Sequence, residues 1–221
     1  MAGAARRAKR TPEEVTLMAV SKMVEPERIR QAYEADVRVF GENRVQEFEE
    51  KAGALKGLGG CEWHLVGHLQ SNKAVKAAEL FDGIDSVDSL RLAQKLNAAA
   101  VQLNRKIKVL IEINIGGEAT KSGVEANSQE LEQILRAAPQ LYALQIGGLM
   151  TIPPFTDDPE GARPYFQRLR ELRDQIARRK LPQVQTAVLS MGMSHDFEIA
   201  IEEGSTRVRI GTAIFGERPR P

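Results

Sequence analysis

The chain has 221 residues, enough for one α/β barrel with a full hydrophobic core, so we expect a single domain over residues 1–221. Its 31 Lys and Arg residues against 30 Asp and Glu leave a formal charge of +1, which argues against nucleic acid or an anionic membrane as a partner. The lone cysteine, Cys61, excludes an internal disulfide and fits a reducing compartment, so we expect a cytoplasmic protein.

The first ten residues are basic and rich in alanine, and they lack the apolar segment that a signal peptide needs. No later apolar run is long enough to span a bilayer. We therefore expect neither export nor membrane contact, and small molecules or proteins as partners.

Short apolar runs rich in β-forming residues alternate with amphipathic stretches along the chain, and a helical pattern fills each interval between two runs. The strand candidates are Val15–Lys22, Val37–Glu42, Glu62–Gly67, Gly83–Val87, Lys108–Ile115, Leu144–Ile152, Thr186–Met191 and Arg207–Phe215. This alternation indicates βαβ units around a parallel sheet, and eight parallel strands predict a single closed (β/α)₈ TIM barrel.

Several helix starts can be read directly. Pro26 is expected in the first turn of one helix, and Ser128 directly precedes another apolar helical pattern. The longest helix is expected from about Pro159 to Lys180, with an apolar stripe between Tyr165 and Ile176. We interpret the arginines on its other side as a solvated face rather than a nucleic-acid patch.

No helical pattern follows the last strand candidate, whereas a barrel normally has an eighth helix there. Residues Ala2–Lys9 can fold back to supply that cover. Because this segment is short, we expect the wall to be thinnest at the seam between the last and first strands.

In barrels of this class the active face is the carboxyl end of the strands. Lys22 ends an apolar run, and partial desolvation there lowers the pKa of a lysine amine and makes it a competent nucleophile toward an aldehyde. Schiff-base chemistry is one interpretation of Lys22. The other is a side chain that extends from the barrel mouth into water.

Two loops at strand ends suit a phosphate group. Ser190 to Ser194 join a strand to a helix with a glycine and two hydroxyls, and Gly211 and Thr212 offer backbone amides and another hydroxyl at the neighbouring strand. Phosphate sites after the seventh and eighth strands recur in this fold. Ser194 also fits an N-cap that satisfies a helix amide, which is the structural alternative.

Arg209 alternates with Val208 and Ile210, so its side chain points to the opposite face, into the barrel mouth. There it can pair with a carboxylate such as Glu112, or donate to the ring nitrogen of a ligand.

The three histidines give weaker signals. His64 and His68 are spaced as a metal pair, but no third ligand stands out nearby, which disfavours a metal site. His195 is read as a solvated residue at a helix start.

With these residues the sequence resembles the pyridoxal 5′-phosphate homeostasis family, which is related to the N-terminal barrel of alanine racemase. The resemblance covers nearly the whole chain. Its segments are Ala19–Lys22, Phe40–Asn43, Val45–Glu47, Trp63–His64, Leu69–Lys73, Leu189–Ser194, Gly204–Thr206, Val208–Gly211 and Ile214–Gly216.

The resemblance implies that the cofactor is pyridoxal 5′-phosphate (PLP), held as an internal aldimine on Lys22 with Asn43 beside it. It also implies that Ser194, Gly211 and Thr212 hold the phosphate and that Arg209 faces the pyridine nitrogen. Lys121, in the sequence Thr120-Lys121-Ser122-Gly123, matches a family lysine near the cofactor. One departure is visible, because family members usually carry a full helix before the first strand and here only residues 1–14 precede Val15.

The function implied is that of a non-catalytic PLP-binding protein in intracellular PLP homeostasis, a carrier or regulator in vitamin B6 and amino-acid metabolism. A monomer is expected, without the C-terminal β domain of the racemases. The expected partners are PLP-dependent apo-enzymes or a regulatory protein.

Two enzymatic alternatives stay open. An amino-acid racemase needs a second acid–base group opposite the lysine, which alanine racemases take from a second domain that we do not find here. A Schiff-base aldolase would bind a phosphorylated sugar on Lys22 and be colourless when purified, whereas either PLP-binding function predicts a yellow protein.

Overall fold

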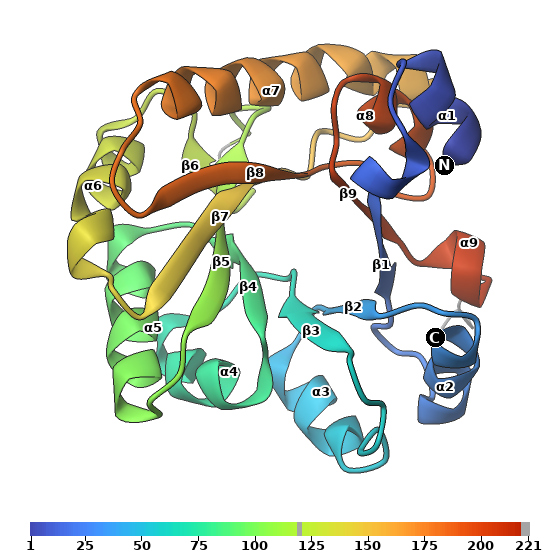
Figure 1. Cartoon of the computed structure of the whole chain (residues 1–221), viewed down its shortest axis with the longest axis horizontal. Helices are drawn as coiled ribbons and strands as arrows, with labels where there is room; N and C mark the ends of the chain where they lie inside the picture. The colour runs from blue at the N-terminus through green and yellow to red at the C-terminus, as the bar shows by residue number, and fades with distance from the viewer. Residues whose placement is uncertain (119–120, 218–221) are drawn as a thin grey trace.

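Eight parallel strands form a closed wall in the computed structural model, which describes residues 1–118 and 121–217 (Figure 1). The strands are β1 (Thr16–Val20), β2 (Val39–Glu42), β3 (Glu62–Leu65), β4 (Gly83–Val87), β5 (Ile107–Asn114), β7 (Leu144–Met150), β8 (Val184–Ser190) and β9 (Arg207–Ile210). Neighbours pair in the order β4-β3-β2-β1-β9-β8-β7-β5, and β4 pairs with β5 to close the ring. The predicted (β/α)₈ barrel is confirmed.

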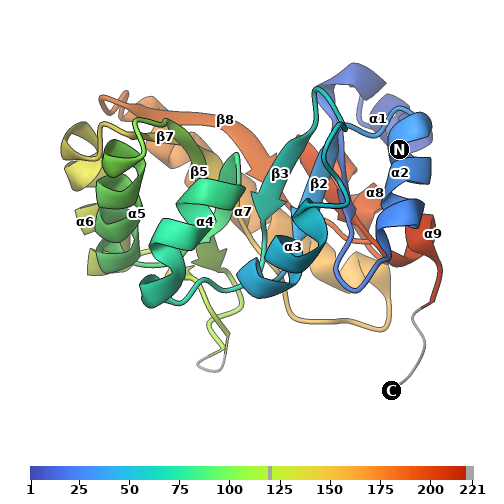
Figure 2. The same cartoon turned by 90° about the horizontal axis from the view of Figure 1, so that it is seen from below.

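One principal helix fills each interval between successive barrel strands, and the helices lie outside the wall (Figures 1 and 2). They are α2 (Pro26–Glu34), α3 (Val45–Ala52), α4 (Ala74–Leu80), α5 (Leu90–Gln102), α6 (Gln129–Ala137), α7 (Arg163–Arg178) and α8 (Phe197–Glu202). Short 3₁₀ turns, η1 (Pro12–Glu14), η2 (Ser71–Lys73), η3 (Ala138–Gln140) and η4 (Pro159–Ala162), adjoin these elements. None of the helices in the described ranges is long and apolar enough to cross a membrane.

The helix starts follow from local chemistry. Pro26 is the first residue of α2, where its missing amide hydrogen costs no hydrogen bond. The Ser128 hydroxyl accepts a hydrogen bond from the Leu131 amide and caps α6. The helix expected near Pro159 begins as η4 and continues as α7, which buries Phe166 and Ile176 against the wall. Apolar side chains on the outer face of the strands and the inner faces of the helices form the main core.

The amino-terminal segment folds back as predicted. Helix α1 (Ala2–Arg7) packs on α8, and its Ala4 and Ala5 are buried with Val208 of β9 in a small separate core. Figure 1 shows α1 beside α8, outside β9 and β1. Arg10 donates to the carbonyl oxygens of Ile201 and Ser205, which ties the segment to the end of α8.

The seam between β9 and β1 is paired over four positions, from Thr16 with Arg207 to Ala19 with Ile210. The shortest ladder lies instead between β8 and β9, where Ser190 and Arg207 are the one pair in register. Our expectation that the wall is thinnest at the β9–β1 seam is therefore wrong for the strands. Beyond Ser190 the chain turns, although the Met191 amide still bonds to the Arg207 carbonyl.

Several strand predictions extend too far at their carboxyl ends, including those to Gly67 and Ile152, where β3 ends at Leu65 and β7 ends at Met150. The first strand ends at Val20, before Lys22, and the last strand ends at Ile210 rather than Phe215. Beyond that point a helical turn, α9 (Thr212–Phe215), satisfies the backbone, because the Ile214 and Phe215 amides donate to the Gly211 carbonyl. A short strand, β6 (Val124–Glu125), pairs with the end of β5 and was not predicted.

Candidate functional site

The predicted site residues lie at the carboxyl ends of four adjacent strands, in the order β2, β1, β9, β8. Val20 pairs with Gly41 across β1 and β2, and Ala19 pairs with Ile210 across β1 and β9. Lys22, Asn43 and Gly211 therefore follow neighbouring strands at one edge of the barrel mouth.

Lys22 is half-buried and lies in a short turn that follows β1. The amide of Ser21 donates to the Gly41 carbonyl, which extends the pairing with β2 by one bond. Directly after Lys22, Met23 adopts a left-handed conformation with φ 58°, and 71% of its surface is exposed. A non-glycine residue in this region needs support from its surroundings.

That support comes partly from a buried ion pair beneath the turn. The Lys51 ammonium of α3 lies 2.8 Å from Glu42 Oε1 and donates to the Ser21 carbonyl at 2.8 Å. The Ser21 hydroxyl donates to the same Glu42 oxygen at 2.5 Å. Burial raises the pKa of Glu42 above its usual range, although the Lys51 charge acts in the opposite direction.

The other side of the turn is bound by Glu47, one helical turn before Lys51 in α3. Its Oε1 accepts a hydrogen bond from the Met23 amide and another from Lys51 at 2.9 Å. Burial raises the pKa of the Glu47 carboxyl, but the Met23 amide and the Lys51 ammonium outweigh that effect and hold it below its usual range. Sequence reasoning missed this network. The spacing of Glu47 and Lys51, four residues apart on a helix, was the available signal.

Asn43 is half-buried and follows β2 directly. Its backbone runs against Gly67, where an added Cβ would lie 2.3 Å from the Asn43 carbonyl oxygen. Only glycine permits this approach, so the loop after β3 holds the Asn43 backbone at the mouth.

The loop after β8 differs from the prediction at Ser194. Helix α8 begins at Phe197 with Asp196 in the N-cap position, so the N-cap interpretation of Ser194 is wrong. Asp196 accepts the Met193 amide at 2.7 Å, while Gly192 turns the chain with φ 94°. Ser194 is thereby directed across the gap to β9, where its Oγ accepts the Gly211 amide at 3.4 Å.

Gly211 and Thr212 form the start of α9. An added Cβ on Gly211 would lie 3.4 Å from the Val20 carbonyl oxygen, so the Gly211 backbone lies close to the end of β1. Thr212 is exposed and is the first residue of α9. A hydroxyl from Ser194, an amide from Gly211 and a hydroxyl from Thr212 thus lie on adjoining segments next to the strand that leads to Lys22.

Arg209 is 4% exposed and makes no ion pair among the described residues. Its guanidinium donates to the Ser190 carbonyl at 2.9 Å, to the Ser190 hydroxyl at 2.8 Å and to the Thr151 carbonyl at 2.7 Å. Burial lowers the pKa of Arg209. Of the two interpretations of Arg209, the pairing with Glu112 is not formed, and Ser190 acts as its hydrogen-bond partner.

Glu112 is buried near the same mouth and accepts the Ser122 hydroxyl at 3.0 Å, while its second oxygen has no hydrogen-bond partner among the described residues. Burial raises the pKa of this carboxyl. Lys121 pairs with Glu118 at 2.5 Å and donates to the Pro153 carbonyl at 3.4 Å. Thr120 lies outside the described residues.

The histidines have separate partners. His64 is buried and its Nδ1 lies 2.8 Å from Asp85, whereas the exposed His68 lies 3.0 Å from Asp88. No group of three or more His, Cys, Asp or Glu side chains suited to a metal ion occurs within residues 1–118 and 121–217. His195 is exposed and contacts the Thr156 carbonyl at 3.1 Å.

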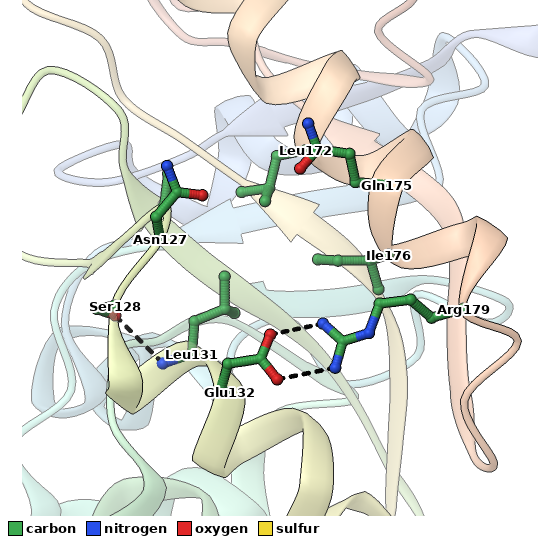
Figure 3. Close-up of a pocket in the computed structure, with 9 residues that line it drawn as sticks. Asn127, Ser128, Leu131, Glu132, Leu172, Gln175, Ile176 and Arg179 are labelled. Carbon is green, nitrogen blue, oxygen red and sulfur yellow. Dashed lines mark hydrogen bonds and ion pairs between the residues drawn. The ribbon is translucent and has the colours of Figure 1, made fainter.

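A cavity of about 210 Å³ lies away from this mouth, between α6 and α7 (Figure 3). Glu132 of α6 and Arg179, which follows α7, bridge it with two hydrogen bonds of 2.6 and 2.8 Å. Its lining contains none of the predicted site residues. It is a gap between two helices on the outside of the barrel.

Comparison with known proteins gives a consistent assignment. Residues 4–219 match the family model of the alanine racemase N-terminal domain. The chain is 49% identical over 202 residues to the pyridoxal phosphate homeostasis protein of Aquifex aeolicus, covering 91% of this chain and 86% of that protein. It is 43% identical over 220 residues to the Escherichia coli protein of the same name, covering 99% and 92%.

Similar solved structures support the same assignment. The structure of PipY from Synechococcus elongatus with PLP bound is 40% identical, covers 96% of this chain and 97% of that chain, and has a TM-score of 0.84. Alanine racemase from Clostridium difficile is 19% identical with a TM-score of 0.70, and the match covers 99% of this chain but 56% of the racemase. The racemase likeness shows a shared fold.

Proposed function

Since this chain belongs to the family of pyridoxal phosphate homeostasis proteins, we propose that it binds PLP at the carboxyl end of its barrel and serves in PLP homeostasis. The observation that carries the proposal is the placement of Lys22 next to a phosphate-compatible rim. The PLP-bound PipY structure, similar over nearly the full length of both chains, supports the same ligand.

The residues at the mouth fit the chemical parts of PLP. Lys22 offers an amine for the aldehyde, and the Gly211 amide and the Ser194 hydroxyl, which hydrogen-bond to each other at 3.4 Å, are the donors that we assign to the phosphate. Thr212, at the first position of α9, adds a further hydroxyl. PLP supplies an aldehyde carbon that forms a Schiff base with an amine. In this proposal Lys22 is that amine.

Arg209 is assigned to the pyridine nitrogen, with Ser190 and Thr151 as the groups that hold its guanidinium. A permanently charged donor keeps the ring nitrogen unprotonated, which weakens the ring as an electron sink. The backbone of Asn43 is held by Gly67, and we assign Asn43 to the side of the cofactor that faces away from β9.

We further propose that the protein does not turn over amino acids. The names of its relatives denote homeostasis rather than a reaction. The described residues correspond to little more than half of the alanine racemase chain, so the rest of the racemase has no counterpart among them. The same proposal includes transfer of PLP to apo-enzymes or a regulatory protein. It also includes a monomeric state, a cytoplasmic location and a single domain over residues 1–221.

The test is a titration of cofactor-free protein with PLP, followed by absorbance. Wild type should become yellow as a Schiff base forms, and Lys22→Ala should not. Ser194→Ala and Thr212→Ala should each weaken retention by about 1–2 kcal/mol, as expected for a lost charge-assisted hydrogen bond. A double variant that retains PLP as well as wild type would place the phosphate elsewhere and overturn this assignment.

A further inference from the structure

Three charged side chains, Glu42 at the end of β2 and Glu47 and Lys51 of α3, surround the turn that carries Lys22. Lys51 binds the Ser21 carbonyl at 2.8 Å, Glu42 binds the Ser21 hydroxyl at 2.5 Å, and Glu47 binds the Met23 amide. The backbone of the residue before Lys22 and that of the residue after it are therefore both held by these side chains. Lys51 joins the two anchors, because its ammonium contacts both carboxylates.

Such an arrangement is costly in free energy. The Lys51 side chain is 9% exposed and that of Glu42 is fully buried, so two charges have been removed from water. Within residues 1–118 and 121–217, the second oxygen of Glu42 has no hydrogen-bond partner. Buried ion pairs often contribute little net stability, whereas they can hold one arrangement of the backbone in preference to others.

The turn needs such support. Met23 has φ 58° while most of its surface is exposed, so packing of its own side chain does not hold it in the left-handed region. The turn is closed by the Val24 amide, which donates to the Ser21 carbonyl at 3.1 Å, and the hydrogen bond from the Met23 amide to Glu47 is the side-chain contact that adds to it. Loss of that bond would let the turn relax and would move the Cα of Lys22.

We propose that Lys51, with Glu42 and Glu47, is a positioning group for Lys22. The three residues hold the backbone on both sides of Lys22 so that its amine is presented to the aldehyde at the mouth. They bind the chain and make no contact with PLP. This inference rests on the proposed function, since it assigns a role in the Schiff-base site.

The principal variant is Lys51→Met, which keeps the length of the side chain and removes the ammonium. The matched control is Lys76→Met in α4, because Lys76 also bridges two carboxylates, Glu49 at 2.8 Å and Glu79 at 3.2 Å, but lies on the surface. Three quantities are compared in protein that is folded by circular dichroism. They are the affinity for PLP, the pH dependence of its reaction with Lys22, and hydrogen exchange of the Met23 amide in cofactor-free protein.

Lys51→Met should lower PLP affinity by roughly tenfold or more, the effect of losing a hydrogen bond to a charged group, and should speed exchange of the Met23 amide. The pH dependence of the reaction between PLP and Lys22 should also shift in this variant. Lys76→Met should match wild type in PLP affinity, in this pH dependence and in exchange of the Met23 amide. A folded Lys51→Met protein that behaves like Lys76→Met would overturn the proposal. Wild-type protein that forms no adduct on Lys22 would instead refute the proposed function itself.

A second pair of variants covers the case in which Lys51→Met does not fold. Glu47→Gln keeps an oxygen that can accept the Met23 amide, while Glu47→Ala removes it, and the residue is only partly buried. We expect Glu47→Gln to restore most of the Met23 amide protection and PLP affinity that Glu47→Ala loses. Equal behaviour of the two variants would contradict the positioning role.

Discussion

Arg209 and Lys51 are both buried cations, and sequence reasoning reached only the first. Arg209 was found because it alternates with apolar residues at a strand end, which places its side chain inside the mouth. Lys51 lies on a helix, where its spacing to Glu47 indicates an ion pair, but its buried partners Ser21 and Glu42 lie on other elements, so the helix pattern does not indicate its burial. The N-cap alternative for Ser194 was wrong because Asp196, two residues later, is an equally good capping residue and takes that position.

Arg209→Gln should change the spectrum of bound PLP more than its affinity. The substitution removes the charged donor from the ring nitrogen and from the carbonyls of Ser190 and Thr151, of which Ser190 keeps the Thr151 amide as a donor. The protein should therefore also lose about 1–3 kcal/mol of unfolding free energy. Absorbance and urea denaturation measure the two effects. An unchanged spectrum in a variant that still binds PLP would remove the assignment to the ring.

His64 should make stability depend on pH. Burial disfavours its charge, but the charge and hydrogen bond of Asp85 prevail, so the pKa of His64 is raised in the folded state. The stabilisation from this pair is fully present below the unfolded pKa of about 6.5 and is lost as pH rises through the folded pKa.

Urea denaturation from about pH 6 upward should show the unfolding free energy falling with pH in wild type and in the control His68→Gln, whose imidazole is exposed. His64→Gln should lack that part of the slope. The same slope in all three proteins would show that another group is responsible.

The strands and helices were largely predictable because two periodicities alternate along the chain, and each interval of the barrel repeats the same pattern. Ends of elements were less predictable. Whether residues 211–215 continue β9 depends on a partner strand, and β1 has already ended at Val20. The short pairing of β6 with β5 likewise depends on tertiary contacts that two residues cannot encode.

Helix α1 should contribute to stability through one face only. Ala5 is fully buried, so Ala5→Asp places a carboxylate against the small core and should cost roughly 2–4 kcal/mol. Ala2→Asp makes the same change on the exposed first turn, where a negative charge is favourable. Chemical denaturation should separate the two variants. Equal losses would show that α1 does not cover the β9–β1 seam in solution.

The barrel as a unit is shared with alanine racemases, and the fold therefore does not decide between carrier and enzyme. In the proposed site, Lys22 is the amine assigned to the aldehyde, next to the residues assigned to the phosphate. Racemisation requires a second acid–base group across the ring, acting in a site that excludes water. The distinction between carrier and racemase is thus a matter of rate.

Incubation of the PLP-loaded protein with L-alanine in deuterium oxide measures that rate through exchange of the α-proton. We expect exchange far slower than enzymatic turnover, with at most slow displacement of Lys22 by the amino acid. Exchange at roughly one per second or faster that depends on Lys22 would identify the protein as a racemase instead.

Borohydride reduction of the PLP-loaded protein, followed by peptide mapping, shows which lysine carries PLP. Reduction fixes the cofactor to the amine that holds it. We expect a single adduct on Lys22 in wild type, at about one per chain. An adduct on Lys121, Lys73 or Lys51 in wild-type protein, with Lys22 unmodified, would contradict it.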